Sequence, residues 1–596
     1  MTSHVIATAG HVDHGKSTLV RALTGIEPDR WAEERRRGLT IDLGFAWTVL
    51  PSGAEVSFVD VPGHERFLGN MLAGLGPAPI VCFVVAADEG WQAQSSDHRD
   101  AIAALGIDQG LIVVTRADLA PGRVDEVLAQ ARVELSGTGL AHAPAVVVSA
   151  TTGLGMEALR TVLDSVVSTS REAVPGDRVR LWVDRSFSLP GAGTVVTGTL
   201  GEGSIRVGDL LELTGAGASR RVHVRGLQSR GEGVGQLGPV SRAAVSLRGA
   251  DAAEVARGDA LLSVDRWTMA DLVDVRATSP DMFADGPLQL VAHVGAAAVT
   301  ARVRPLGADH ARLALDRPLP LRVGDRMVLR GSGARVVRTG ALVLDVDPPA
   351  LARRGDAARR AEALAASGAT GDLAAEVTRR GAVPLDRLIR QGIAVPRELP
   401  AGVRSSGSLL VAESAIIAWA AALRAAVADE HDQRPFSAGL PRKAALDAVG
   451  ARPELLPELV ERADLVEQGG RISDPRRSTG LGAAEIAIAS LERRLGGDPF
   501  AAPEADDLAA LGLGTEQLAA AARLDRVLRL PGEVILLPAA PALAMRELAR
   551  LEQPFTTSQA RQALGTSRRV VIPLLEHLDS RGWTRRLDAG HRQVVR

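Results

Sequence analysis

Two glycines separated by four residues, with a lysine and a serine directly after the second, carry the clearest chemical signal in this sequence. They are Gly10 and Gly15, followed by Lys16 and Ser17. Backbone N–H groups of such a loop hold phosphate oxygens, the ammonium group reaches the outer phosphates, and the hydroxyl binds magnesium. The spacing therefore predicts a nucleotide phosphate site. Its expected residues are His11, Val12, Asp13, His14, Gly15, Lys16, Ser17 and Thr18.

A carboxylate and a glycine follow the strand-like apolar run 56–59. Asp60 would lie where this strand ends, beside the phosphates, and would hold magnesium through water. Gly63 would offer its N–H group to the outermost phosphate. The same residues would also form an ordinary Pro-Gly turn, but a second phosphate-type motif at a neighbouring strand end favours the nucleotide site.

Residues at the ends of the fourth and fifth strand-like runs predict which base is bound. Asp118 can accept hydrogen bonds from N1 and the 2-amino group of guanine, a pair that adenine does not offer. Thr115 and Arg116 stand where an asparagine and a lysine are more common, and the arginine can lie along the base. A surface loop is the alternative. The expected ligand is GTP or GDP, with Ser149 and Ala150 completing the base site.

These motifs need strands that hold them at one edge of a sheet. Short apolar runs alternate with helix-length segments, which predicts an α/β domain with a largely parallel sheet over residues 1–172. A helix is predicted after the phosphate loop, at 18–23. The predicted strands are 4–9, 56–61, 80–87, 111–115 and 145–149.

The class of structure changes twice after this domain. Short β-branched runs with Gly-rich turns predict two small β-barrels, over 175–264 and 266–347. Beyond them the chain is rich in alanine, leucine and arginine, and each helical stretch ends in a short β-like pair. This rhythm predicts mostly α winged-helix repeats, with one irregular α-solenoid as the alternative. The pairs are 403–412, 460–472, 527–537 and 583–595, and the modules are 350–413, 414–476, 480–538 and 540–596.

Composition narrows the function classes without choosing one. No stretch approaches eighteen uninterrupted apolar residues and the chain starts directly in a strand-like run, so a soluble protein that is not exported and makes no membrane contact is expected. A cytoplasmic location and a monomeric state are expected as well. The single cysteine, Cys82, excludes a disulfide framework within one chain. The net charge of −2 gives no global sign of nucleic-acid binding. Of 69 basic residues only Lys16 and Lys443 are lysines, which singles out the lysine of the phosphate loop.

The phosphate loop, the segment 37–41 and the run 60–64 together resemble the translational GTPases, to which elongation factor Tu belongs. The resemblance covers the whole α/β domain. It implies that His64 is the catalytic residue, which orients the attacking water when the ribosome stimulates GTP hydrolysis. It also implies that Val12 and Leu39 form an apolar gate in front of this histidine. The implied metal ligands are Ser17, Thr40 and Asp60.

Further segments resemble one branch of these GTPases, the selenocysteine-specific elongation factors. They are 86–91, 115–118, 184–187 and 191–198, and the barrels followed by winged helices are similar as well. The resemblance implies GTP-dependent delivery of selenocysteinyl-tRNA to the ribosome at recoded UGA codons, with an mRNA hairpin as a further partner. A selenol is an anion at neutral pH, so an electropositive pocket would distinguish it from serine. The implied pocket residues are Asp184, Arg185 and Arg242.

The last stretch, 556–596, resembles the module of this branch that binds the RNA hairpin. It holds eight arginines against three acidic residues, a local excess of +5. Thr566 and Ser567 are predicted to cap a helix, so that Arg568 and Arg569 face outward at its first turn. A solvated arginine-rich face is the alternative. The apolar face of this helix is Val570, Val571, Leu574, Leu575 and Leu578. The expected RNA contacts are Arg568, Arg569, Arg585, Arg586 and Arg592.

Three other functions share parts of these patterns. A general aminoacyl-tRNA carrier or an initiation-type GTPase would have the same phosphate site but does not need the helical extension. A nucleic-acid-binding regulator with a nucleotide-gated switch would use the winged helices, but the barrels argue for tRNA. A guanylyl-binding sulfate-activation subunit lacks winged helices.

Overall fold

The computed structural model describes residues 3–28, 40–170, 178–215, 217, 219–279, 282–331, 333, 336–477 and 481–595. The chain divides into two compact units. One is Met1–Glu376 with Pro384–Pro400, and the other is Val377–Val383 with Ala401–Arg596. No helix in the described part of the chain has the length and apolar character that crossing a membrane requires.

A six-stranded sheet forms the centre of the N-terminal domain. Its order is β2-β3-β1-β4-β5-β6, and every neighbouring pair is parallel except β2 with β3. The carboxyl ends of the parallel strands share one edge, where ligands of such sheets bind. The strands are β1 Ser3–Ala9, β2 Gly44–Val49, β3 Glu55–Asp60, β4 Ile80–Ala86, β5 Gln109–Thr115 and β6 Ala145–Val147.

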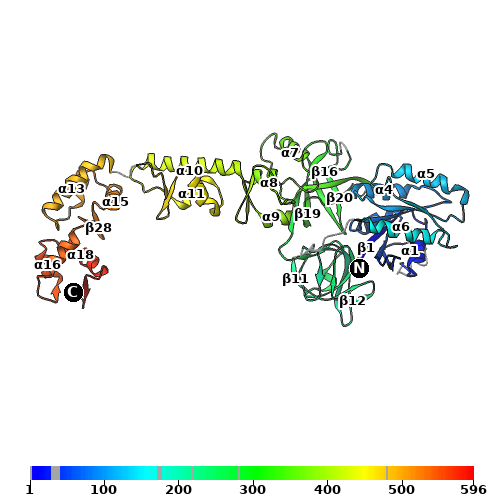
Figure 1. Ribbon diagram of the computed structural model, residues 1–596, viewed down its shortest axis with the longest axis horizontal. Coiled ribbons are helices and arrows are strands. Elements are labelled where there is room, and N and C mark those ends of the chain that lie inside the picture. Colours follow the sequence, from blue (N-terminus) through cyan, green and yellow to red (C-terminus); the bar gives the residue numbers. More distant parts are fainter. Residues whose placement is uncertain are drawn as a thin grey trace. The chain divides into compact units, whose positions relative to one another are not determined.

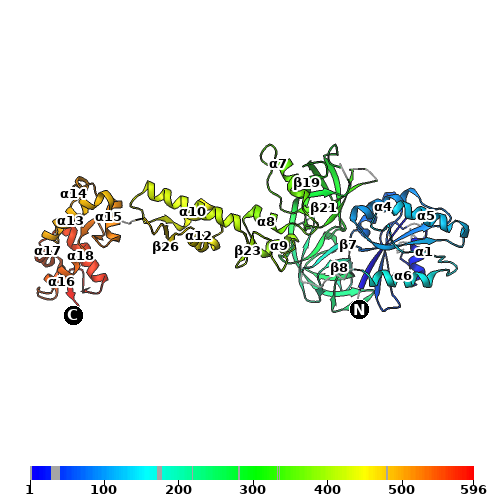
Figure 2. The same ribbon diagram turned by 45° about the horizontal axis from the view of Figure 1, so that its top comes forward.

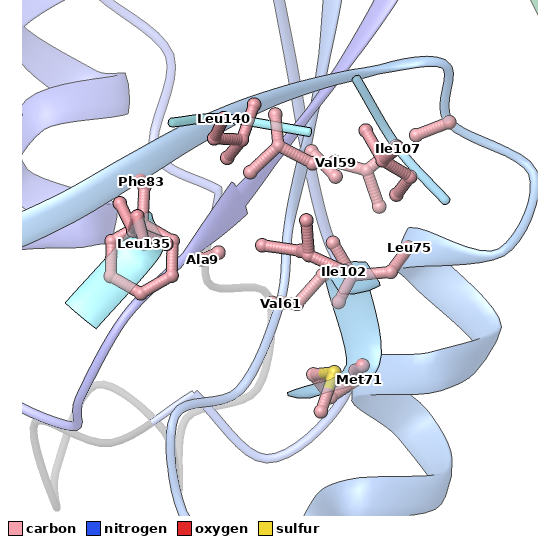
Figure 3. Packing of buried hydrophobic residues seen from close by; sticks show 14 of the residues in the cluster. Ala9, Val59, Val61, Met71, Leu75, Phe83, Ile102, Ile107, Leu135 and Leu140 are labelled. Atoms are coloured by element: carbon pink, nitrogen blue, oxygen red, sulfur yellow. The ribbon is translucent and has the colours of Figure 1, made fainter. Parts of the chain in front are cut away.

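Helices cover both faces of this sheet (Figure 1). One face carries α3 Leu68–Leu75, α4 Ala93–Leu105 and α5 Val124–Leu135, and the other carries α1 Lys16–Thr24 and α6 Met156–Ser168. Figure 3 shows the first layer, in which Met71 of α3 and Ile102 of α4 lie near Val61. Because both faces are buried, the central strands are almost continuous apolar runs.

The predictions for this domain are largely confirmed. The five predicted strands and the helix at 18–23 agree with the observed limits to within two residues at each end. The sequence did not predict β2, which pairs antiparallel with β3 and carries Phe45 and Trp47. Cys82 is buried in β4, and burial raises the pKa of its thiol to about 12, so it is an inert core residue.

Both predicted β-barrels are present. In the first, the order β10-β15-β7-β8-β14-β11 closes because β10 also pairs with β11. The second is closed in the order β16-β19-β18-β17-β20-β21. The main strands of the first are β7 Arg180–Leu189, β8 Gly193–Glu202, β10 Leu210–Thr214, β11 Arg220–Ser229, β14 Ser241–Arg248 and β15 Ala260–Ser263; those of the second are β16 Thr268–Ala277, β17 Gln289–Val294, β18 Ala297–Pro305, β19 His310–Leu321, β20 Arg326–Gly331 and β21 Val337–Asp345.

The rest of the chain is mostly helical, with small antiparallel hairpins at the four expected places. One prediction starts too early, because residues 460–462 of the expected pair 460–472 belong to helix α12, Leu456–Arg462. The repeated hairpins contradict the α-solenoid alternative, while the module limits stay predictions. The hairpins are β23 Val403–Ser406 with β24 Leu409–Ala412, β26 Val466–Gln468 with β27 Arg471–Ser473, β28 Leu528–Leu530 with β29 Val534–Leu536, and β31 Thr584–Arg586 with β32 His591–Val594.

Each hairpin lies among helices. Figure 2 shows α10 beside α12, and α16, α17 and α18 grouped near the C-terminus. The helices are α7 Asp356–Ala365, α8 Leu373–Arg380, α9 Leu385–Gln391, α10 Glu413–Gln433, α11 Arg442–Val449, α12 Leu456–Arg462, α13 Glu485–Gly497, α14 Ala505–Ala510, α15 Thr515–Arg523, α16 Ala540–Leu548, α17 Thr557–Ala563 and α18 Arg568–Ser580.

Candidate functional site

The phosphate loop connects β1 to α1 and depends on its glycines. Gly10 has φ 128°, and a Cβ there would lie 2.1 Å from the carbonyl oxygen of Val84. Gly15 precedes the first turn of α1 with φ 83°. Only glycine adopts both conformations without strain. Lys16 Nζ donates to the carbonyl oxygens of Gly10 at 3.0 Å and His11 at 2.7 Å, so its ammonium lies inside the loop, where phosphate oxygens would bind.

Side chains of α4 accept hydrogen bonds from the backbone of this loop. The N–H group of Gly10 donates to His98 Nδ1 at 3.1 Å, and that of Val12 to Gln94 Oε1 at 3.2 Å. Burial lowers the pKa of His98 well below its usual range, so the ring stays neutral and keeps the lone pair that accepts this hydrogen bond. Neither Gln94 nor His98 was predicted as a site residue, because no local spacing connects them to the loop.

Two predicted loop residues are histidines, of which His14 is buried and His11 is half-buried. Burial lowers the pKa of His14 to about 3, and His14 Nδ1 lies 3.4 Å from the carbonyl oxygen of Val84. Burial and the neighbouring Lys16 also lower the pKa of His11. Both imidazoles are therefore neutral at pH 7, which leaves the ammonium of Lys16 as the cation of the loop.

The three predicted metal ligands lie together. Ser17 Oγ donates to Asp60 Oδ2 at 2.6 Å and lies 3.0 Å from Thr40 Oγ1. Thr8 Oγ1 donates to Asp60 Oδ1 at 2.7 Å and so orients the carboxylate. Burial raises the pKa of Asp60, and the hydrogen bond from Ser17 acts against this shift. Hydroxyl and carboxylate oxygens are the ligands that magnesium prefers, so the donor set fits the ion.

The loop after β3 approaches the phosphate loop closely. A Cβ on Gly63 would lie 2.5 Å from the backbone nitrogen of Val12 and 2.6 Å from Lys16 Nζ. Only glycine permits this approach, because any side chain would enter the space of the lysine ammonium. Asp60 and Gly63 are thereby held against the phosphate loop, as the sequence predicted.

The predicted base-binding residues lie at the other end of the same cavity. Thr115 Oγ1 donates to the carbonyl oxygen of His14 at 2.7 Å, so this short side chain ties β5 to the phosphate loop. Arg116 donates to Asp88 at 3.0 Å and to Glu89 at 2.8 Å, while Asp118 is exposed. The cavity has a volume of about 690 Å³. Its lining includes Val12, Asp13, Gly15, Lys16, Ser17, Thr18, Thr40, Gly63, Thr115, Arg116, Asp118, Ser149 and Ala150.

His64 lies half-buried beside the loop and outside that lining. Its Nδ1 accepts a hydrogen bond from the backbone N–H of Arg66 at 3.2 Å, and its ring centroid is 6.0 Å from that of Phe67. The hydrogen bond fixes the lone pair of Nδ1, so Nε2 is the nitrogen left for other partners. Of the predicted apolar gate, Val12 lines the cavity and Leu39 lies outside the described residues.

The three predicted pocket residues of the first barrel also come together. Asp184 on β7 is buried, and its carboxylate accepts from Thr197 Oγ1 at 2.7 Å and from Arg242 Nη2 at 2.9 Å. Arg242 on β14 binds both carboxylate oxygens of Asp184. The carboxylate therefore fixes the direction of this guanidinium group.

A phenylalanine from β2 of the N-terminal domain packs against both pocket arginines. The Phe45 ring centroid is 3.8 Å from the guanidinium carbon of Arg242 and 4.9 Å from that of Arg185. Arg185 also donates to the carbonyl oxygen of Leu43 and pairs with Asp42 at 3.3 Å. Asp42 and Phe45 were not predicted as site residues, because nothing in the neighbouring sequence indicates that β2 reaches the first barrel.

The C-terminal arginines divide into two groups. Arg568, Arg585 and Arg586 are exposed. Arg569 instead donates to the carbonyl oxygens of Ala502 and Pro503 and pairs with Glu504 at 3.2 Å, so the prediction that it faces outward is wrong. Arg592 is 6% exposed and donates to Asp579 at 2.8 Å, which gives it a structural role.

The start of helix α18 agrees with the sequence only in part. Ser567 occupies the N-cap position, but its side chain makes no capping hydrogen bond. Thr566 Oγ1 donates instead to the carbonyl oxygen of Phe500 at 2.6 Å, so capping by these side chains is not observed. The predicted apolar face is confirmed, with all five of its residues buried.

Three family models match the chain. Residues 2–169 match the elongation factor Tu GTP binding domain, and residues 275–350 match the β-barrel domain of the selenocysteine-specific elongation factor. Residues 546–593 match the winged helix of elongation factor SelB.

Comparisons with individual proteins agree with these matches. The chain is 33% identical to the selenocysteine-specific elongation factor of Escherichia coli (strain K12) over 98% of both chains. It is 38% identical to that of Desulfomicrobium baculatum over 55% of this chain and 53% of the relative. Its structure is similar to the crystal structure of a bacterial selenocysteine-specific elongation factor, EF-Sec, with a TM-score of 0.78, 26% identity and 100% of both chains covered. The similarity includes the helical extension, which the general-carrier alternative leaves unexplained.

Proposed function

This chain belongs to the family of selenocysteine-specific elongation factors, and we propose that it carries selenocysteinyl-tRNA in complex with GTP to the ribosome at recoded UGA codons. It is a translational GTPase that binds guanine nucleotides. The observation that supports the choice of amino acid is the pair of arginines on the first barrel, which both pack against the ring of Phe45 beside a buried carboxylate. As a ribosomal factor it would act in the cytoplasm, as a monomer.

In the nucleotide site, each group has a task that its position supports. Ser17, Thr40 and Asp60 would hold Mg²⁺, which would neutralise phosphate charge during phosphoryl transfer. The ammonium of Lys16 would bind the outer phosphates, and the carboxylate of Asp118 would accept from guanine. His64 would turn toward the outermost phosphate on the ribosome and orient the attacking water through Nε2.

In the aminoacyl pocket, charge would select selenocysteine. A selenolate carries a full negative charge at neutral pH, whereas the hydroxyl of serine is neutral. Arg242, fixed by Asp184, and Arg185 would each donate to the selenolate. A seryl group would leave this local positive charge without its anion, which costs binding free energy.

At the C-terminus, exposed arginines support binding of an mRNA hairpin. Arg568 lies at the first turn of α18, and Arg585 and Arg586 lie on β31. The deep, narrow major groove of an A-form helix does not admit a protein helix. We therefore expect contacts with the phosphates of the hairpin and with its unstacked loop bases.

The test is protection of the aminoacyl ester against hydrolysis. With GTP, the protein should protect selenocysteinyl-tRNA and leave its seryl precursor exposed, and GDP should protect neither. Arg242→Ala should lose most of this protection, because a desolvated anion that loses its partner costs about 2–5 kcal/mol, while GTP affinity stays the same. Equal protection of both tRNAs by the unmodified protein would refute the proposal.

A further inference from the structure

Arg257 lies where three segments of the protein meet. It belongs to the connection between β14 and β15 of the first barrel. Its Nε donates to the backbone carbonyl of Asp184 at 3.0 Å, Nη1 to Asn70 Oδ1 at 2.6 Å, and Nη2 to Asp42 Oδ1 at 2.5 Å. The planar guanidinium thus binds three directed acceptors at once, a task that the point charge of a lysine does not perform.

The first of these contacts belongs to the aminoacyl pocket. Asp184 gives its carboxylate to Arg242 and its backbone carbonyl to Arg257, so the two arginines hold the same residue from different sides. Asp42 lies between Arg257 and Arg185, with its second oxygen 3.3 Å from Arg185. Arg257 therefore fixes one pocket residue directly and a second one through a shared carboxylate.

The other two contacts lead to the nucleotide cavity. Asp42 follows two residues after Thr40, which lines that cavity 3.0 Å from Ser17 Oγ. Asn70 lies on α3, the helix that follows the loop of His64, and its amide donates to the carbonyl oxygen of Ile41 at 2.9 Å. Two residues of chain span only about 7 Å, so a ligand that fixes the position of Thr40 also restricts the position of Asp42.

The charges of this cluster fit one monovalent anion. Three guanidinium groups, those of Arg185, Arg242 and Arg257, lie with the two carboxylates of Asp42 and Asp184. Among these five described side chains, one net positive charge remains. A selenolate would neutralise it, provided that the two carboxylates keep the guanidinium groups in place.

We propose that Arg257 is a positioning residue that couples the bound nucleotide to the aminoacyl pocket. When Thr40 is held in the nucleotide site, Asp42 and Asn70 dock on Arg257, which then orders Asp184 and Arg185 for the selenolate. GTP and GDP differ at the outermost phosphate, and differential contacts there shift the population of the docked state. The proposal rests on the proposed function, since it requires that this pocket receives selenocysteine.

The test compares the affinity for selenocysteinyl-tRNA in two nucleotide states. Titrations of the full-length protein with a non-hydrolysable GTP analogue and with GDP give an affinity ratio, which Arg257→Ala should lower about tenfold, a typical size for coupling between sites. The affinity for selenocysteinyl-tRNA should fall in the presence of the GTP analogue and stay the same in the presence of GDP. Affinities of the free protein for both nucleotides should stay within a factor of about 3, as expected when only coupling is removed.

Two further variants keep the test independent of folding. Asp42→Asn keeps the size of the side chain and removes its charge, and it should lower the ratio in the same direction by a smaller factor. Arg257→Lys keeps the charge but not the three directed hydrogen bonds, so the ratio should fall there too. If both variants keep the ratio of the unmodified protein, the coupling role is excluded.

The matched control is Arg230→Ala. Arg230 pairs with Glu55 at 2.7 Å between the same two domains, and in the described part of the chain no hydrogen bond or ion pair joins it to Asp42 or Asp184. The affinity ratio of the Arg230→Ala variant should equal that of the unmodified protein. An equal fall in Arg230→Ala, or equal losses in both nucleotide states for Arg257→Ala, would overturn the proposal. If the unmodified protein does not distinguish selenocysteinyl-tRNA from seryl-tRNA, the proposed function itself fails.

Discussion

The nucleotide cavity and the C-terminal module were both predicted as binding sites from their polar residues, but these residues have different surroundings in the structure. Thirteen of the predicted nucleotide and metal residues line one cavity of about 690 Å³. In the C-terminal module, by contrast, Arg569 and Arg592 bind groups of the protein itself. A motif defined by backbone geometry thus identifies a site, whereas an excess of charge identifies only a region. A guanidinium group binds an internal carbonyl or carboxylate as readily as a phosphate.

The largest effect expected in the nucleotide site is on catalysis. His64→Ala should leave GTP affinity nearly unchanged and slow ribosome-stimulated hydrolysis by roughly 10³-fold, because a group that orients water acts mainly in the transition state. Single-turnover hydrolysis with ribosomes measures this. A parallel loss of GTP affinity would make His64 a structural residue and weaken the contrast between the two regions.

The next effect concerns stability in the C-terminal module. Arg592→Ala should lower the free energy of unfolding of this module by about 3 kcal/mol, because it removes the buried guanidinium that binds Asp579. The half-buried carboxylate then keeps its hydrogen bond from Thr584 but loses its charged partner. Arg585→Ala, at an exposed position on the neighbouring strand, should change it by less than about 0.5 kcal/mol. Thermal unfolding of the two variants measures the difference. Equal stability would mean that Arg592 is available to RNA after all.

Base selection tests the other end of the nucleotide cavity. Asp118→Asn should weaken GTP binding by about 100-fold and favour xanthine nucleotides, since the amide reverses the hydrogen-bond direction at the base. Competition binding with GTP, XTP, ATP and CTP measures it. Unchanged GTP affinity would remove Asp118 from the site, although the bond from Thr115 to the phosphate loop would remain.

The smallest effect is expected for the exposed arginines. Arg568→Ala together with Arg585→Ala should weaken hairpin binding by about 10-fold and flatten its dependence on salt by roughly one unit per lost phosphate contact. A gel-shift series across salt concentrations measures both. Arg569→Ala is the matched control and should leave the salt slope unchanged, because its guanidinium binds Ala502 and Pro503. A lower slope in Arg569→Ala would show that its internal contacts open on RNA.

The sequence by itself determined the features that depend on neighbouring residues. The spacing of Gly10, Gly15 and Lys16 defines the phosphate loop, because a positive φ and a helix start are local properties. The alternation of apolar runs with helix-length segments predicted the sheet, and β-branched runs with Gly-rich turns predicted both barrels, because these patterns are local as well. The strand ends then placed Asp60 and Asp118 at one edge of the sheet.

Only the tertiary structure decided which distant groups meet. His98 supports Gly10 from α4, and Phe45 enters the pocket from β2, although no spacing rule relates either residue to its partner. The same holds for the choice between Arg569, bound to carbonyl oxygens, and Arg568, exposed one residue earlier. Contacts of this kind depend on how whole elements pack. This packing is driven by the burial of apolar surface from the whole domain, so it cannot be predicted from a short stretch of sequence.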